Sequence, residues 1–168
     1  MSTQEHRAKA AAQRATFAVL TISDTRTAET DEAGRIIRTL LTGAGHSQRH
    51  YAIVKDEPDL IDQHLRAWLG ESGLDLIVCT GGTGIASRDT TIDVVRRLLE
   101  QELEGFGELF RMLSFEQVGP AAMLSRAVGG LAGETLLFAL PGSTNAVRLA
   151  MEKLILPELP HMVWERRR

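Results

Sequence analysis

The sequence predicts a three-layer α/β/α domain with a mostly parallel sheet. Short, nearly continuous apolar runs, clearest at 17–23, 74–80 and 135–140, are typical of strands that are buried on both faces. Segments with apolar residues at helical spacing separate these runs, and such alternation is typical of parallel strands joined by right-handed crossovers. The length of 168 residues favours a single domain with one core.

The expected elements follow in order along the chain. Residues 1–16 are polar and alanine-rich, so we expect a frayed helix or flexible arm there, followed by the folded domain at 17–168. The expected strands are 17–23, 51–54, 74–80, 127–132 and 135–140. The expected helices are 33–41, 61–69, 91–100, 105–118 and 146–155. Asp31 is the expected N-cap of the first of these helices, and Gly43 or Gly45 its end.

Composition and charge exclude several classes of function. Nineteen Lys and Arg against 22 Asp and Glu give a formal net charge of −3, whereas a general nucleic-acid binder needs a basic surface to neutralise phosphates. The longest apolar runs are far below the roughly 20 residues of a membrane span, and 1–16 lack the apolar segment of a secretory signal. Cys79, the only cysteine, lies inside a predicted strand, which favours a buried structural thiol over a nucleophile. We therefore expect a cytoplasmic protein that binds neither nucleic acid nor membranes.

Four polar loops are expected to meet at one edge of the sheet, because ligands of open parallel sheets bind outside the carboxyl ends of the strands. The loops are 23–25, 55–57, 80–84 with Arg88 and Asp89 behind it, and 141–145. They contain glycines, hydroxyls and carboxylates, and no Cys or His. The five histidines are scattered without the spacing of a metal motif, so we expect neither a catalytic histidine nor a zinc site.

The glycines of 80–84 predict an anion-binding loop. Gly81, Gly82 and Gly84 have no Cβ, so within this glycine run only Thr83 has a side chain that could block a ligand. The backbone N–H groups can then point at an anion near the start of a helix. A tight turn in which glycine only supplies a positive φ is the alternative. The second glycine loop at 141–143 favours the functional interpretation. No Lys-Ser/Thr pair closes the first loop, and the third glycine of a dinucleotide fingerprint is absent.

Two acidic residues follow predicted strand ends. Asp56 and Asp89 near phosphates would be typical of a Mg²⁺ site that is completed by substrate oxygens. A helix cap is the alternative for each of them, and also for Asp24. The glycines of 105–111 need a steric reason within a helix, and a subunit interface and a substrate wall with Glu108 and Arg111 both remain open.

Four motifs occur in a fixed order. They are Thr-Gly-Gly-Thr-Gly-x₄-Asp at 80–89, Glu-Gly-Phe-Gly-Glu-x-Phe-Arg-x-x-Ser-Phe-Glu at 104–116, Ser-Arg-Ala at 125–127 and Phe-Ala-Leu-Pro-Gly-Ser at 138–143. Together they resemble the molybdenum cofactor biosynthesis protein B (MoaB/MogA) family, which includes the G domain of gephyrin. The resemblance covers roughly 18–160. It implies a MogA-like fold, a homotrimer or homohexamer, and a molybdenum-inserting protein as the candidate recipient of the product.

The resemblance also implies an adenylyltransferase. In the family the terminal phosphate of molybdopterin attacks the α-phosphate of Mg-ATP, giving adenylylated molybdopterin and pyrophosphate. It implies that Asp56 and Asp89 are catalytic and bind Mg²⁺, and that Gly81, Gly82, Thr83 and Gly84 bind the nucleotide phosphates. The residues it implies for molybdopterin are Ser23, Asp24, Gly142, Ser143, Glu108, Arg111, Ser125 and Arg126.

Three interpretations of function follow from the resemblance. Some bacterial B-type members carry Glu or another residue at the position of Asp56, and the aspartate here favours an active enzyme. A non-catalytic molybdopterin carrier or scaffold is the alternative, and it would share the same pocket. A relative of the competence/damage type is expected to have a further domain, for which 168 residues leave no room.

Overall fold

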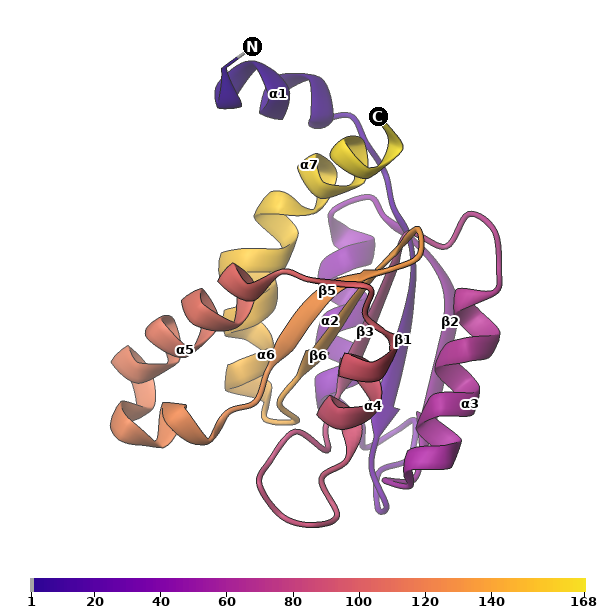
Figure 1. Cartoon of the computed structure of the whole chain (residues 1–168), viewed down its shortest axis with the longest axis vertical. Helices are drawn as coiled ribbons and strands as arrows, with labels where there is room; N and C mark the ends of the chain where they lie inside the picture. Colours follow the sequence, from indigo (N-terminus) through magenta and orange to yellow (C-terminus); the bar gives the residue numbers. More distant parts are fainter. Residues whose placement is uncertain (1) are drawn as a thin grey trace.

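The computed structural model describes residues 2–168 and places a six-stranded sheet between two layers of helices (Figure 1). The strands are β1 (Thr16–Ile22), β2 (Ser47–Val54), β3 (Leu76–Thr80), β4 (Gln101–Glu102), β5 (Val128–Ala132) and β6 (Thr135–Leu140). The helices are α1 (Thr3–Ala10), α2 (Glu32–Gly43), α3 (Pro58–Leu69), α4 (Thr91–Leu98), α5 (Glu104–Val118), α6 (Thr144–Ala150) and α7 (Leu156–Arg167), with a 3₁₀ turn η1 (Gly119–Leu124) and a π turn η2 (Met151–Ile155). The expected three-layer class is confirmed.

The sheet is mostly parallel, in the order β2-β1-β3-β6-β5-β4. Strand β1 pairs in parallel with β2 and β3, and β3 pairs in parallel with β6. Strands β5 and β6 form an antiparallel hairpin, because the chain reverses at Gly133, which has a φ of +60°. The two-residue strand β4, which the sequence pattern did not predict, pairs with β5 at the edge of the sheet.

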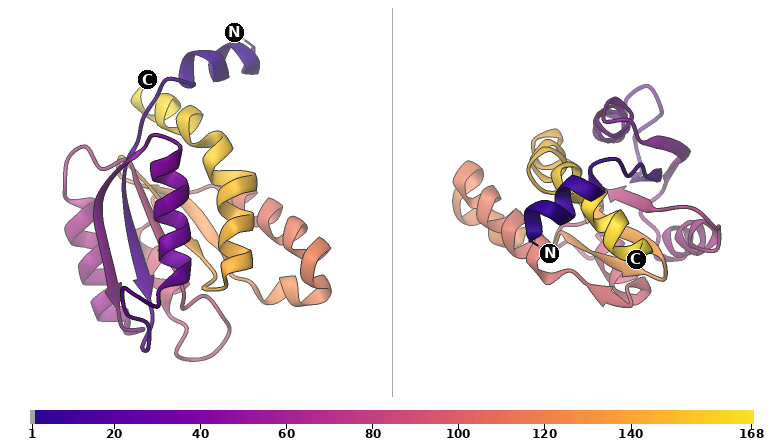
Figure 2. Two further views of the ribbon diagram at one scale, coloured as in Figure 1. Left: turned by 180° about the vertical axis from the view of Figure 1, so that it is seen from behind. Right: turned by 90° about the horizontal axis from the view of Figure 1, so that it is seen from above.

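Alternate residues of the central strands β1, β3 and β6 face the two helical layers. Phe17 and Val19 of β1 belong to a core under α2, α5, α6 and α7, whereas Ala18 and Leu20 belong to a core under α3 and α4. Figure 2 shows α2 and the C-terminal helices on the same face. The continuous apolar runs are therefore explained by burial on both sides.

The C-terminal helical segment is longer than expected. We expected its end at residue 155, but after η2 the chain continues as α7 to Arg167. The N–H of Leu156 donates to the Met151 carbonyl five residues earlier, so the wide π turn leads directly into Pro157, which has no N–H of its own. Leu159 of α7 is fully buried, and this packing holds the helix in spite of its prolines.

The described part of the N-terminal arm contains the helix α1, and Met1 lies outside the described residues. Ser2 and Glu5 form a capping box at its start. The helix lies against α7 near the C-terminus (Figure 1), where Arg7 pairs with Glu158 and Arg167 donates to Gln13 at 2.9 Å. Within residues 2–168, none of the helices has both the length and the apolar character needed to cross a membrane.

Candidate functional site

The carboxyl ends of β1, β2, β3 and β6 lie at one edge of the sheet, at the lower end of the molecule in Figure 1. The strand order changes direction between β1 and β3, which is where ligands bind in open α/β sheets. Strand β5 runs the opposite way, and its first residue, Val128, pairs with Ala139 near the end of β6. The segment that leads into β5 therefore reaches the same edge as the four expected loops.

The first glycine loop contacts the ends of β1 and β6 and also has backbone N–H groups that are free. Gly81 has a φ of +97°, and a Cβ there would lie 2.2 Å from the Ile22 carbonyl oxygen. The Gly81 N–H donates to the Leu140 carbonyl at 3.0 Å, so this N–H is already used. The N–H groups of 82–84 donate to no backbone carbonyl of the residues that the structure describes. These three groups are the ones available to an anion.

The two predicted acidic residues lie against the glycines of this loop. A Cβ on Gly82 would lie 2.8 Å from Oδ2 of Asp56 and 2.3 Å from Oγ1 of Thr91. A Cβ on Gly84 would lie 2.7 Å from Oδ2 of Asp89. One carboxylate therefore stands beside each glycine, and only a residue without a side chain fits at Gly82 and Gly84 without displacing them.

Asp56 is not a helix cap, so that alternative is wrong for this residue. The N-cap of α3 is Glu57, which makes no capping hydrogen bond through its side chain. The Asp56 carboxylate instead accepts a hydrogen bond from the Thr90 hydroxyl at 3.1 Å. The Asp56 N–H donates to Oδ1 of Asp24 at 3.1 Å. Three loops therefore meet at Asp56.

Asp89 is not the N-cap of α4 either, because that position is Thr90. Its Oδ2 accepts a hydrogen bond from the Ala86 N–H at 3.0 Å, which closes the loop between β3 and α4. Asp24 pairs with Arg88 from the same loop. Of the three acidic residues, Asp24 is thus neutralised by a cation, whereas Asp56 and Asp89 have no Lys or Arg partner among the described residues.

The negative charges of Asp24 and Asp89 affect the pKa of Asp56. Burial raises the pKa of the Asp56 carboxyl, and the negative charges of Asp89 and Asp24 raise it further. Hydrogen bonds from Thr90 act in the opposite direction. A half-buried carboxylate that feels the negative charges of two others is an arrangement that a divalent cation would stabilise.

The second glycine loop touches the first. A Cβ on Gly142 would lie 3.5 Å from the Cα of Gly81. Ser143 is the N-cap of α6, and its hydroxyl accepts a hydrogen bond from the Ala146 N–H at 3.3 Å. The structure therefore gives Ser143 a structural contact at the position where the resemblance implies a ligand.

A cavity of about 160 Å³ opens between the loop that follows β1 and the two glycine loops. Its polar lining includes Ser23, Arg26, Thr80 and Thr144. Arg26 was not among the predicted site residues. It places a positive charge at the cavity, which would suit an anionic ligand. Its place in the polar loop after β1 was the only sequence signal for it.

Asp31 also lines this cavity. It caps α2 as predicted, because Oδ1 accepts a hydrogen bond from the Gly34 N–H at 3.0 Å. Its Oδ2 accepts hydrogen bonds from the Thr21 hydroxyl at 2.6 Å and the Tyr51 hydroxyl at 2.5 Å. Burial and this carboxylate raise the pKa of Tyr51. Asp31 is satisfied by the protein and is part of the scaffold.

The segment before β5 and the helix α5 meet at the rim of the site. Arg111 of α5 donates to the Ala127 carbonyl at 3.1 Å, and Arg126 donates to Asp93 in the first turn of α4 at 2.6 Å. A Cβ on Gly107 would lie 3.1 Å from the Ala127 carbonyl oxygen. The close approach of α5 to this segment is therefore the steric reason for Gly107.

The other two rim residues are placed differently. The hydroxyl of Ser125 is buried and has no hydrogen-bond partner within the described chain. Glu108 is exposed on α5. Thr90, which holds Asp56, was missed by the sequence argument because a threonine before a helix is commonly only a cap.

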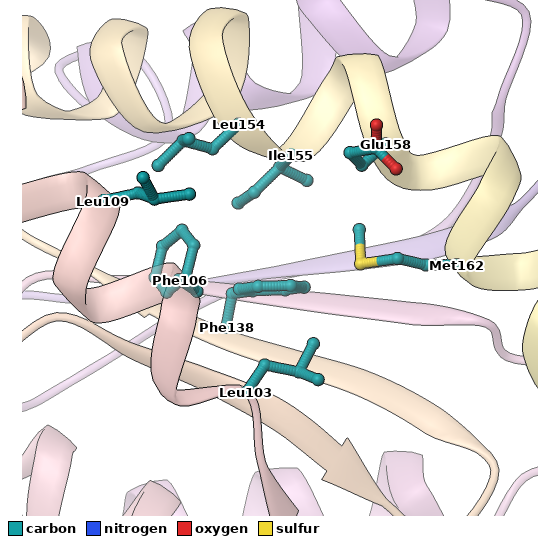
Figure 3. A pocket seen from close by; sticks show the side chains of 8 residues that line it. All are labelled: Leu103, Phe106, Leu109, Phe138, Leu154, Ile155, Glu158 and Met162. Atoms are coloured by element: carbon teal, nitrogen blue, oxygen red, sulfur yellow. The ribbon is translucent and has the colours of Figure 1, made fainter. Parts of the chain in front are cut away.

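A second pocket lies between α5 and the C-terminal helices (Figure 3). Phe106 and Phe138 meet edge to face in its wall at a centroid distance of 4.9 Å. Apart from Glu158, its lining side chains are apolar. It lacks the glycine loops and the carboxylate pair, so its chemistry does not suit a phosphorylated ligand.

The sequence matches the profile of the family described as "Probable molybdopterin binding domain" over residues 18–161. Molybdenum cofactor biosynthesis protein B of Bacillus cereus is 50% identical over 166 residues, covering 98% of each chain. A crystal structure of a molybdenum cofactor biosynthesis protein B has a TM-score of 0.89 at 49% identity and covers 92% of this chain and 97% of that one. The tungsten cofactor synthesizing protein MoaB from Pyrococcus furiosus has a TM-score of 0.83 at 36% identity and covers 93% and 99% of the two chains.

Proposed function

Since the chain belongs to the molybdopterin-binding domain family of molybdenum cofactor biosynthesis proteins, we propose that it adenylylates molybdopterin with Mg-ATP. The terminal phosphate oxygen of molybdopterin attacks the α-phosphorus of ATP, the bond from that phosphorus to the bridging oxygen breaks, and pyrophosphate leaves. The observation that carries the proposal is the placement of Asp56 and Asp89 against Gly82 and Gly84 of one loop. The two carboxylates therefore lie beside the loop whose N–H groups at 82–84 are free.

Asp56 and Asp89 would hold the magnesium ion. Their donor set is oxygen only, which magnesium prefers, and ATP oxygens and waters would complete its shell. Repulsion within the acidic cluster contributes to the raised pKa of Asp56, and a bound cation would relieve it. When bound, magnesium neutralises charge on the phosphates.

The remaining chemistry needs no nucleophile from the protein. Cys79 is fully buried in β3, and burial raises the pKa of its thiol to about 12, so it supplies no thiolate. The N–H groups of 82–84 would bind and orient the nucleotide phosphates, since phosphoryl transfer depends mostly on positioning and charge stabilisation. Transfer is then a matter of holding two anionic substrates in line.

The cavity lined by Ser23, Arg26 and Thr144 suits the molybdopterin phosphate. Gly142 lets the second loop approach Gly81, which would bring the two substrates together. Arg126 and Ser125 at the rim supply further polar groups on the side of β5. Asp24 would act indirectly, because it holds the Asp56 backbone and Arg88.

The test is a pyrophosphate-release assay on the purified chain with Mg-ATP and molybdopterin. Product formation that requires magnesium would support the proposal. Molybdopterin binding without pyrophosphate release, and without a magnesium-dependent nucleotide site in calorimetry, would contradict it and favour the carrier alternative.

We also propose that the chain forms a homotrimer or homohexamer. Helix α5 exposes a line of apolar side chains, of which Met112 is 55% and Phe115 57% exposed, whereas Phe106 and Phe110 lie in the core. An exposed apolar line of this kind is typical of an interface. Light scattering in solution measures the number of subunits. A cytoplasmic location and transfer of the product to a molybdenum-inserting protein stay predictions.

A further inference from the structure

We propose that His6, His161 and Glu165 bind one metal ion of the zinc class and thereby fasten α1 to α7. His6 lies on α1, whereas His161 and Glu165 lie one turn apart on α7. The two helices meet at the end of the molecule opposite the glycine loops (Figures 1 and 2). The proposal therefore stands apart from the proposed adenylylation.

The two distances to Glu165 fit a metal shell better than hydrogen bonds. Nδ1 of His6 is 3.4 Å from Oε1 of Glu165, and Nε2 of His161 is 3.6 Å from the same oxygen. One donor atom from each residue lies within 4.8 Å of the others. Hydrogen bonds from nitrogen to oxygen are shorter, at about 2.7–3.2 Å. Ligands at about 2.0–2.2 Å from a tetrahedral zinc ion lie roughly 3.3–3.6 Å apart.

His161 is already oriented as a ligand. Its Nδ1 lies 3.0 Å from Oε2 of Glu158, so the Nδ1–H can donate to that carboxylate and leave the lone pair of Nε2 for the metal. Glu158 is in turn paired with Arg7 of α1. A carboxylate behind a histidine ligand is the usual outer shell of zinc sites and fixes both the tautomer and the ring orientation.

The donor set determines which ion the site would take. Two imidazoles and one carboxylate suit zinc, cobalt or nickel, whereas magnesium and calcium prefer oxygen. The His6 and His161 side chains are 20% and 23% exposed, so they are shielded but reachable by an ion from solvent. His6 also packs beside Trp164 at a centroid distance of 5.0 Å. Water would occupy a fourth position.

Spacing along the chain could not reveal this cluster. His6 and His161 come from the two ends of the sequence and become neighbours only because α1 folds back onto α7. The expectation that the histidines form no zinc site was based on local motifs alone. A metal held by both helices would order the N-terminal arm against the domain.

The experiment titrates the full chain, freed of metal by a chelator, with Zn²⁺ by calorimetry and with Co²⁺ by visible absorption. We expect one ion per chain. His6→Gln and His161→Gln should weaken Zn²⁺ binding by more than roughly 100-fold, and Glu158→Gln by roughly 10- to 100-fold, since outer-shell partners have effects of that size. His64→Gln is the matched control, because His64 packs beside Trp68 on α3 and should not alter binding.

A second readout uses the unmodified chain. Zn²⁺ should slow amide hydrogen exchange in α1, because the ion links this helix to α7. The proposal is overturned if the unmodified chain does not bind Zn²⁺, or if His6→Gln and His161→Gln bind it as tightly as His64→Gln. Binding that leaves exchange in α1 unchanged would also overturn it.

Discussion

Replacing Gly82 by alanine is the sharpest test of the site geometry. A Cβ at this position would lie 2.3 Å from Oγ1 of Thr91 and 2.8 Å from Oδ2 of Asp56. Thr91 is fully buried at the start of α4, and Asp56 is held by Thr90, so neither side chain can move away freely. The backbone is also unfavourable for alanine, because φ is +64°.

The size of the effect can be worked out from these two features. Alanine in the left-handed region costs about 1–2 kcal/mol of unfolding free energy relative to glycine. The clash adds about 1–3 kcal/mol, the usual cost of an extra methyl group in a packed site. We therefore expect Gly82→Ala to lose about 2–5 kcal/mol in total. It should also lose turnover, because Asp56 must shift.

Gly133→Ala is the matched control. Its φ is +60°, close to that of Gly82, but no atom lies within 4 Å of the added Cβ. The backbone cost is similar in the two variants, so only the clash should distinguish them. Urea unfolding should show that Gly82→Ala is less stable than Gly133→Ala by about 1–3 kcal/mol. Equal stability of the two variants, with full pyrophosphate release by Gly82→Ala, would refute the proposed packing of Asp56 against the loop.

Three further predictions concern the same region. Asp89→Asn should lower turnover by roughly 100-fold or more, while the molybdopterin affinity measured by calorimetry stays the same. Equal loss of turnover and affinity would show that Asp89 has a structural role instead. The pKa of Asp56 is raised in the folded state, so its contribution to stability falls as pH rises through that pKa. Asp56→Asn should therefore be more stable than the parent at pH 7 and about as stable below the ordinary aspartate pKa. Urea unfolding at both pH values checks the sign. Gly105→Ala should stabilise the chain by up to about 1 kcal/mol, since no atom lies within 4 Å of the added Cβ. Gly107→Ala should destabilise it by about 1–3 kcal/mol, because its Cβ would lie 3.1 Å from the Ala127 carbonyl oxygen. Thermal unfolding measures both effects.

The layers, and the sheet edge that carries the candidate site, could be predicted from the sequence. Apolar runs such as that of β3 can only be buried on both faces, and helical spacing between them leaves the parallel α/β class. Polar residues directly after these strands had to gather at one edge. Asp56, Asp89 and the glycine loop of the candidate site were predicted in this way, because a strand end is a local signal.

The contacts that these groups make depend on tertiary packing. Only packing shows that the Gly81 N–H is bonded to Leu140, that Thr90 holds Asp56, and that the reversed strand β5 brings Arg126 to the rim. These contacts join segments that are distant in sequence, so periodicity and propensity carry no record of them. The meeting of His6 with His161 has the same origin. Local patterns specify which elements form, and the burial of their faces against one another determines which side chains become neighbours.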